Sequence, residues 1–455
     1  MSLQAGFHPF TQRNTELSSP CNERAQHSRG YRLTDVRPSQ VRRRKNANPT
    51  TSIAVPAGGG TQGRTDLYVV DAERVSPKSV DCGYPLIYDE TKRKGERLRM
   101  DNSQLPGRLG DKNATLLTDR RADPRIVAVL EAAGDLGAAT DPISASASYD
   151  ECLEYCAAFE AVGASAHPLA EAAMPAFPDV SSSIETIKGV DGNDITLYID
   201  QPVTRTGSSP CILHTHGGGM VLMTAADPGF VRWRRSLASA GMVVVGVEFR
   251  NGGGKLGNYP FPAGLNDCAS ALQWTHANRE TLGISAICIS GESGGGNLAI
   301  ATTLKAKQEG WLEQVDGVYA LCPYISGAYG APPPNLLSLE ENDGYSLDCQ
   351  QMAALVKLYD PDNVHATNPL AWPYHATAAD IEGLPPHFIS VNELDPLRDE
   401  GIEYYRKLVK AGNSAVARTV HGTNHAGDMS FPDVTPDLYE STLRSLVGFA
   451  GSLVG

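Results

Sequence analysis

The feature that most constrains the fold is a glycine-flanked serine between a strand-like run and a helix-like run. Residues 287–290 (Ile-Cys-Ile-Ser) are typical of a short buried strand, and residues 297–301 (Asn-Leu-Ala-Ile-Ala) are typical of a helix. Between them, residues 291–295 (Gly-Glu-Ser-Gly-Gly) fit the pattern G-x-S-x-G. A sharp strand-to-helix turn exposes the serine hydroxyl and leaves no room for side chains beside it, which explains the glycines. The stretch therefore predicts Ser293 as a nucleophile that needs a base.

Strand-like and helix-like segments alternate on both sides of this turn. Short apolar strands separated by helices predict an α/β fold, with a mostly parallel central sheet and helices on both faces. A hairpin is expected around Asp191-Gly192. The expected strands are Ile184–Lys188, Ile195–Ile199, Cys211–Thr215, Met242–Glu248, Ala286–Ser290, Gly317–Leu321, His387–Val391 and Ala415–Val420. The expected helices are 228–240, 262–278, 295–309, 349–359, 397–411 and 436–453.

The composition and the hydrophobic pattern divide the chain into three expected parts. Residues 1–65 are polar and without periodicity, and residues 66–99 contain one strand-like run at 67–70 and a basic stretch. Together, residues 1–99 are expected to be a disordered extension, with Met100 as the hypothesised natural start. Residues 100–180 are expected to be cap helices. One starts at Asp123-Pro124, and another near 149–161 has an apolar stripe that is typical of packing; Ala166 to Phe177 is expected to link onward. Residues 181–455 are expected to be the catalytic domain, with a Pro-, Tyr- and Gly-rich cap insertion at about 325–375.

Charge and cysteine usage exclude several classes of function. The net charge of -13 argues against a nucleic-acid partner for the whole chain, although residues 1–99 hold 17 basic against 10 acidic residues. The basic run at residues 42–45 is expected to be a solvated cluster, with a nucleic-acid or targeting patch as the alternative. The nine scattered cysteines lack a C-x-x-C pair and are expected to be free thiols, without a zinc site. No signal peptide or run of 18 apolar residues is present, so a cytoplasmic protein without a membrane partner is expected.

A second glycine cluster is expected to stabilise an oxyanion. His216-Gly217-Gly218-Gly219 follows an expected strand, 77 residues before Ser293. Enzymes with this kind of turn use backbone N–H groups of such a loop, together with the residue after the serine, to hold the oxyanion. We therefore expect Gly218, Gly219 and Gly294 to be the donors. The three glycines at 252–254 are interpreted as a flexible turn.

The acid and the base are expected to follow the serine in that order. Asp395 lies at the carboxyl end of an expected strand, 102 residues after Ser293, although it could instead cap the helix that follows. Asp399 and Glu400 are competitors on that helix. For the base, His425 lies in a loop a further 30 residues on, and His421 is its rival.

The assembled motifs are similar to those of the hormone-sensitive-lipase-like esterases, the bacterial family IV carboxylesterases of the α/β-hydrolase superfamily. The resemblance rests on HGGG, GESGGG, DPLRDEG and a glycine-x-x-histidine near the end, and it covers roughly residues 120–450. GESGGGNLAIATTL, ENDGY, PLAWPY and VNELDPLRDEGI look most like a member that opens a macrocyclic lactone. Two positions depart from the family pattern: Glu292 replaces a frequent Asp, and Gly294 a frequent Ala.

The resemblance implies an α/β-hydrolase fold with a helical cap and a serine carboxylic-ester hydrolase. It implies Ser293 as nucleophile, Asp395 as acid and His425 as base, with no cofactor and no metal. The expected partner is a small-molecule ester or lactone, and the expected state is a monomer or homodimer. An amidase or peptidase, or a non-catalytic ligand-binding homologue, is the alternative. The aromatics Tyr324, Tyr329, Trp372 and Tyr374 are expected either to line the pocket or to pack the cap.

Overall fold

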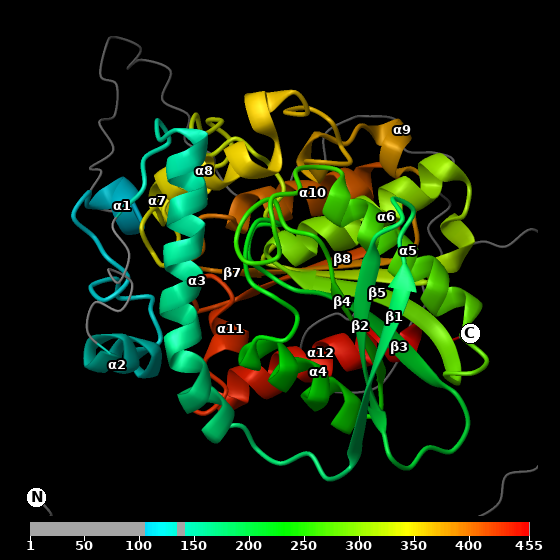
Figure 1. Ribbon diagram of the computed structural model, residues 1–455. Coiled ribbons are helices and arrows are strands. Elements are labelled where there is room, and N and C mark those ends of the chain that lie inside the picture. The colour runs from blue at the N-terminus through cyan, green and yellow to red at the C-terminus, as the bar shows by residue number, and fades with distance from the viewer. Residues whose placement is uncertain (1–104, 134–141, 455) are drawn as a thin grey trace, which may run out of the picture. The chain divides into compact units, whose positions relative to one another are not determined.

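The apolar runs predicted as strands pair into one eight-stranded sheet (Figure 1). It lies in residues 105–133 and 142–454, the part of the chain that this computed structural model describes. The strand order is β1-β2-β4-β3-β5-β6-β7-β8. The six strands from β4 to β8 in this order are parallel, whereas β1 pairs with β2, and β2 with β4, in the antiparallel sense. The strands are β1 Val180–Lys188, β2 Asp194–Pro202, β3 Ser209–Thr215, β4 Val243–Glu248, β5 Ile284–Glu292, β6 Gly317–Leu321, β7 His387–Asn392 and β8 Ala415–Val420.

Helices cover both faces of the sheet, as predicted from the alternation. Helices α5, α6 and α10 lie on one face, and α4 and α12 lie on the other (Figure 1). The helices over the sheet are α4 Pro228–Ser239, α5 Ala263–Ala277, α6 Gly294–Glu309, α10 Arg398–Lys410 and α12 Pro436–Ser452. The remaining α-helices are α1 Gly107–Gly110, α2 Pro124–Ala133, α3 Tyr149–Ala172, α7 Ser338–Glu341, α8 Cys349–Tyr359, α9 Ala378–Ile381 and α11 Gly427–Ser430.

The central strands are continuous apolar runs because both of their faces are buried. In β4, Val243, Val245 and Val247 belong to the core cluster under α5, α6 and α10. The intervening Val244 belongs to the cluster under α4 and α12. Successive side chains of a strand point to opposite faces, so one run of valines fills two cores. Each such burial contributes about 1.5–3 kcal/mol, which makes the strand ends firm supports for the loops they carry.

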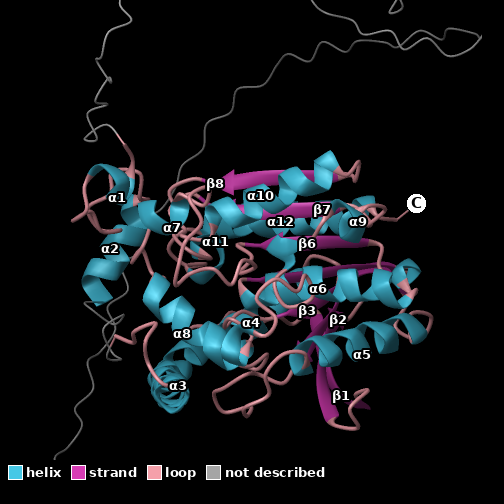
Figure 2. Cartoon of the chain, turned by 90° about the horizontal axis from the view of Figure 1, so that it is seen from above, coloured by secondary structure: helices cyan, strands magenta, loops and turns pink. Residues whose placement is uncertain are grey.

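Two helices lie beyond the carboxyl ends of the parallel strands. In Figure 2 the β8 arrow points toward the side on which α3 and α8 are found, and these two helices contact each other. Cys152 and Cys156 of α3 are fully buried, which confirms the packing stripe. The helix is longer than expected: it runs through Pro168 to Ala172, so the expected linker from Ala166 was wrong over its first half. The end of the helix contains several Ala and Glu residues, which have high helix propensity. Their propensity outweighs the unfavourable effect of Pro168.

The predicted extension, residues 1–99, and its basic run lie outside the described residues. Within the described part, no helix combines the length and apolar character needed to cross a membrane.

Candidate active site

The predicted nucleophile stands on a strained turn between β5 and α6. Ser293 has φ 56° and ψ −119°, a conformation that costs a non-glycine residue about 1–3 kcal/mol. Two hydrogen bonds hold it there: its N–H donates to the Leu321 carbonyl at 2.9 Å, and its carbonyl accepts from the Tyr324 N–H at 3.0 Å. A Cβ on Gly295 would lie 1.9 Å from the Thr215 carbonyl oxygen, so this close approach to β3 requires glycine.

The predicted oxyanion loop leaves β3 directly beside this turn. Gly218 and Gly219 have φ values of +103° and +62°, so the loop takes a path that favours glycine. Among the described residues, neither of their N–H groups has a hydrogen-bond partner. A Cβ built on Gly294 would lie 2.7 Å from the Gly219 nitrogen. The structure therefore brings the three expected donor residues together, with two unused N–H groups at the mouth of the turn.

The glycines at 252–254 do more than form a turn. The Gly252 N–H donates to the Met220 carbonyl, and the Gly253 N–H to the Val221 carbonyl, both at 2.9 Å. A Cβ on Gly252 would lie 2.8 Å from the Leu358 carbonyl oxygen. The interpretation as a flexible turn was wrong, because these residues fix the backbone that follows Gly219.

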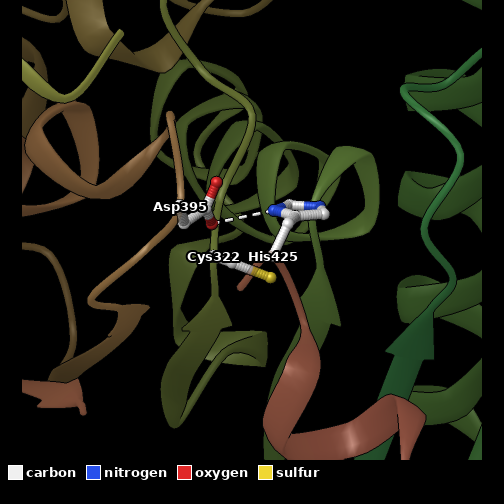
Figure 3. A group of neighbouring side chains, drawn as sticks. All are labelled: Cys322, Asp395 and His425. Atoms are coloured by element: carbon white, nitrogen blue, oxygen red, sulfur yellow. Dashed lines mark hydrogen bonds and ion pairs between the residues drawn. The ribbon is translucent and has the colours of Figure 1, made fainter. Parts of the chain in front are cut away.

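The predicted acid and base meet at the ends of β7 and β8. His425 Nδ1 lies 2.8 Å from Asp395 Oδ2 (Figure 3). The other carboxylate oxygen of Asp395 accepts the Leu397 N–H at 2.9 Å, so the carboxylate closes the turn that precedes α10 and also holds the imidazole. Asp395 is not the N-cap of α10, because that position is Leu397. The two loops are joined because the Leu394 N–H donates to the Thr423 carbonyl at 2.9 Å. Asp395 is fully buried, whereas the His425 side chain keeps 12% exposure.

The charge of Asp395 controls the protonation of His425. Burial by itself lowers the pKa of the imidazole, but the carboxylate beside it raises the pKa well above its usual range. The Cys322 thiol lies close to both of these side chains, below them in Figure 3, directly after the end of β6. Burial raises the pKa of the Cys322 thiol, which keeps the thiol protonated at neutral pH.

These three side chains are also the group of potential metal ligands in the described residues. One ligand atom from each of Cys322, Asp395 and His425 lies within 4.8 Å of the others. Two of these atoms already share the Asp395–His425 hydrogen bond. As placed, the arrangement fits a proton-transfer pair, and a metal would have to replace that bond.

A cavity of about 240 Å³ joins the serine, the glycine loop and the histidine. Apolar side chains from the cap side and from the loops form most of its wall: Phe159, Leu222, Met223, Phe230, Leu347, Met352 and Leu355. Of the four aromatics considered, Tyr324 lines the cavity. Tyr329 and Trp372 are buried in packing, and Tyr374 does not line it, so these three side chains follow the packing alternative.

The rival residues have other partners. His421 is 77% exposed and lies 3.1 Å from Glu393 Oε2. Asp399 Oδ2 accepts the Ser338 N–H at 2.8 Å. Glu400 is buried on α10, where its Oε1 accepts the Ile325 N–H at 2.7 Å. None of these three residues is hydrogen-bonded to His425 among the described residues. The geometry therefore favours Asp395 as the acid and His425 as the base.

The sequence did not predict the roles of two residues near the site. Glu292 was an unexplained departure, and its contacts with His214 and Gly217 depend on β5 lying beside β3. Cys322 is one of the nine cysteines expected to be free thiols, and the sequence assigns it no place in the site. A usable signal existed for Glu292: a carboxylate next to a nucleophilic serine in an otherwise apolar strand needs a buried partner.

Known proteins share this fold. A family model described as alpha/beta hydrolase fold matches residues 212–428. Carboxylesterase NlhH of Mycobacterium tuberculosis is 30% identical over 275 residues, which are 59% of this chain and 82% of that relative. The solved structure of brefeldin A esterase, a bacterial homologue of human hormone sensitive lipase, is 44% identical, with a TM-score of 0.70 over 77% of this chain and 99% of that one. Esterase Est22 is 38% identical, with a TM-score of 0.66 over 74% and 98%.

The matches to whole esterases agree with the motifs and with the strand-end geometry described above. The chain is therefore a carboxylic ester hydrolase that belongs to the hormone-sensitive-lipase-like family, bacterial family IV, of the α/β-hydrolases.

Proposed function

We propose that the protein hydrolyses small to medium neutral esters through Ser293, His425 and Asp395. The observation that carries the proposal is the 2.8 Å contact between His425 and Asp395, at a cavity that also contains Ser293 and the glycine loop. An acid that holds an imidazole, with a serine on the same cavity, is the arrangement that activates a hydroxyl.

The reaction follows from these positions. The Ser293 Oγ attacks the ester carbonyl while His425 takes its proton at Nε2, because Nδ1 is engaged by Asp395. The N–H groups of Gly218, Gly219 and Gly294 stabilise the oxyanion that forms. His425 then gives the proton to the leaving alcohol, and an acyl-enzyme remains. Water, activated by the same imidazole, attacks the acyl-enzyme and releases the acid.

The cavity supports neutral substrates. Its wall is mostly apolar, and no Lys or Arg of the described residues lines it, so an anionic acyl group would lose hydration without gaining a basic partner. Its volume of about 240 Å³ suits an acyl or alcohol part of modest size. Amides are less favoured, because nothing in the described cavity wall is placed specifically for a leaving amine.

Macrocyclic lactones are the finer proposal, supported by the 44% identity to brefeldin A esterase. In a lactone the leaving alcohol stays tethered to the acyl group, so the acyl-enzyme can close back to the ring. Productive opening therefore needs water to reach the acyl-enzyme before the tethered hydroxyl returns.

One series of assays tests these statements. We expect turnover of p-nitrophenyl acetate, butyrate and octanoate, and of brefeldin A as the lactone, with slow or absent turnover of matched p-nitroanilides. Ser293→Ala should lower kcat by at least about 10³-fold and leave the melting temperature within a few degrees. Activity retained within a few-fold would refute the nucleophile, and efficient anilide cleavage would favour an amidase.

A further inference from the structure

The residue directly before the proposed nucleophile has two buried partners, one on the neighbouring strand β3 and one in the loop that follows this strand. Glu292 ends β5 and is 3% exposed, and His214 of β3 is fully buried. Glu292 Oε1 accepts the Gly217 N–H at 2.9 Å, and its Oε2 lies 3.0 Å from His214 Nε2. Since the carboxylate is the acceptor, the imidazole donates from Nε2. The carboxylate thus joins the start of the glycine loop to the strand beneath it.

The glycine loop is therefore held on both sides of its unused donors. On one side, Gly217 is tied to Glu292. On the other side, the carbonyls of Met220 and Val221 accept N–H groups from the 252–254 segment. Between these anchors lie the N–H groups of Gly218 and Gly219, which have no hydrogen-bond partner among the described residues. Both residues have positive φ values, so the loop has no regular secondary structure at this point.

We propose that Glu292 is a positioning residue that sets the oxyanion donors relative to the nucleophile; this rests on the function proposed above. Because Glu292 and Ser293 are consecutive, the anchor and the attacking hydroxyl share one rigid turn. His214 keeps the carboxylate paired in a place from which water is excluded, where an unpaired charge would be costly. A displacement of the donors by about 1 Å is enough to cost roughly 10²-fold in rate.

The test compares variants that keep or remove the hydrogen-bond acceptor. Glu292→Gln keeps the length and one acceptor oxygen for Gly217, so kcat/KM should stay within about fivefold. Glu292→Leu has a similar volume but no acceptor, so kcat should fall about 10- to 100-fold with KM within threefold. Glu292→Met, which is more adaptable in packing, takes its place if the leucine variant does not fold.

A transition-state analogue separates positioning from general damage. An alkyl trifluoromethyl ketone adds to the serine as a hemiketal with an oxyanion, so its Ki should rise by the same factor as kcat/KM falls. The matched control is Asp316→Leu, which removes a half-buried carboxylate that accepts a backbone N–H, that of Ile287 at 2.7 Å, near the amino end of β5 and away from the cavity. It should lower the melting temperature and leave kcat and Ki unchanged.

Each outcome decides the question. Loss of kcat with a parallel rise in Ki, and rescue by Gln, supports the proposal. A leucine or methionine variant with kcat and Ki within threefold of the parent overturns it, as does a fall in kcat without any change in Ki. If Ser293→Ala is inactive while the Glu292 variants are unaffected, only the positioning role fails. If Ser293→Ala stays active, the proposed function fails first.

Discussion

Gly294→Ala is the most informative single perturbation, because a side chain at this position would meet the backbone of the glycine loop. A Cβ at this position would lie 2.5 Å from the Met220 nitrogen and 2.7 Å from the Gly219 nitrogen and Cα. Ordinary contacts between such atoms are about 3.5–4.0 Å, so backbone must move by about 1 Å. The moving backbone is the loop that carries the proposed oxyanion donors.

The cost should fall mainly on the rate. A shift of about 1 Å in the donors is expected to lower kcat by about 10²-fold, or about 2.7 kcal/mol, with KM changed little. The overpacking costs about 1–3 kcal/mol of stability, and the better helix propensity of alanine at the first residue of α6 offsets up to about 1 kcal/mol. The loop cannot relax freely, since Gly217 and Met220 are both hydrogen-bonded on its two sides.

The assay is kcat and KM on p-nitrophenyl butyrate, with the melting temperature of each variant. Gly448→Ala is the matched control: this residue lies on α12 with open space around its Cβ position, so kcat should be unchanged and the helix slightly more stable. Equal kcat for Gly294→Ala and the parent, within threefold, would show that the loop yields without cost and that the contact argument is wrong. In that case, a relative with alanine at the position of Gly294 would not need a different conformation of the glycine loop.

Two further predictions concern proton equilibria. Catalysis needs neutral His425, whose pKa Asp395 raises well above the usual range, so kcat/KM should fall as pH drops through a pKa above about 6.5; Asp395→Asn should move this limb to lower pH and reduce kcat. A pH–rate profile from pH 5 to 9 checks this, and an unmoved limb counts against the pair. Burial raises the pKa of Glu400 to about 7, so its folded-state proton stabilises the protein below pH 4.5, and this stabilisation is lost as pH rises through about 7. In urea unfolding, the free energy of unfolding of the parent should fall between pH 5 and 8 by up to about 3 kcal/mol more than that of Glu400→Gln. The same pH dependence in parent and variant would contradict this prediction.

The sheet was predictable because its strands are short, apolar and separated by helix signals. The bounds of β6 and β8 agree with the expected ones, and most other strands differ by one or two residues, as hydrogen bonding sets ends that hydrophobicity does not mark. The length of α3 was not predictable from its apolar stripe, because its second half is largely exposed and has no periodic pattern.

The site was predictable where each residue belongs to a motif next to a strand end. Ser293, Asp395 and His425 fall there in sequence order, and the structure places them around one cavity or in direct contact. The sequence did not predict the side-chain contacts between neighbouring strands. The partners of Glu292 on β3 depend on which strands are neighbours, and sequence spacing does not carry that information. The same holds for Cys322, which reaches the imidazole only because β6 lies between β5 and β7.

The use of five strand ends for one site also has a consequence for how the chain folds. The proposed donors, nucleophile, acid and base follow β3, β5, β7 and β8, and the elbow is held by hydrogen bonds to β6 and the loop that follows it. All these strands are parallel neighbours, so each pairing closes a long stretch of chain and is slow to form. The reacting groups therefore exist as a set only after the last of these pairings, near the C-terminus, has been made. Esterase activity is a reporter of the completed sheet, and a chain arrested before β8 has a nucleophile without a base.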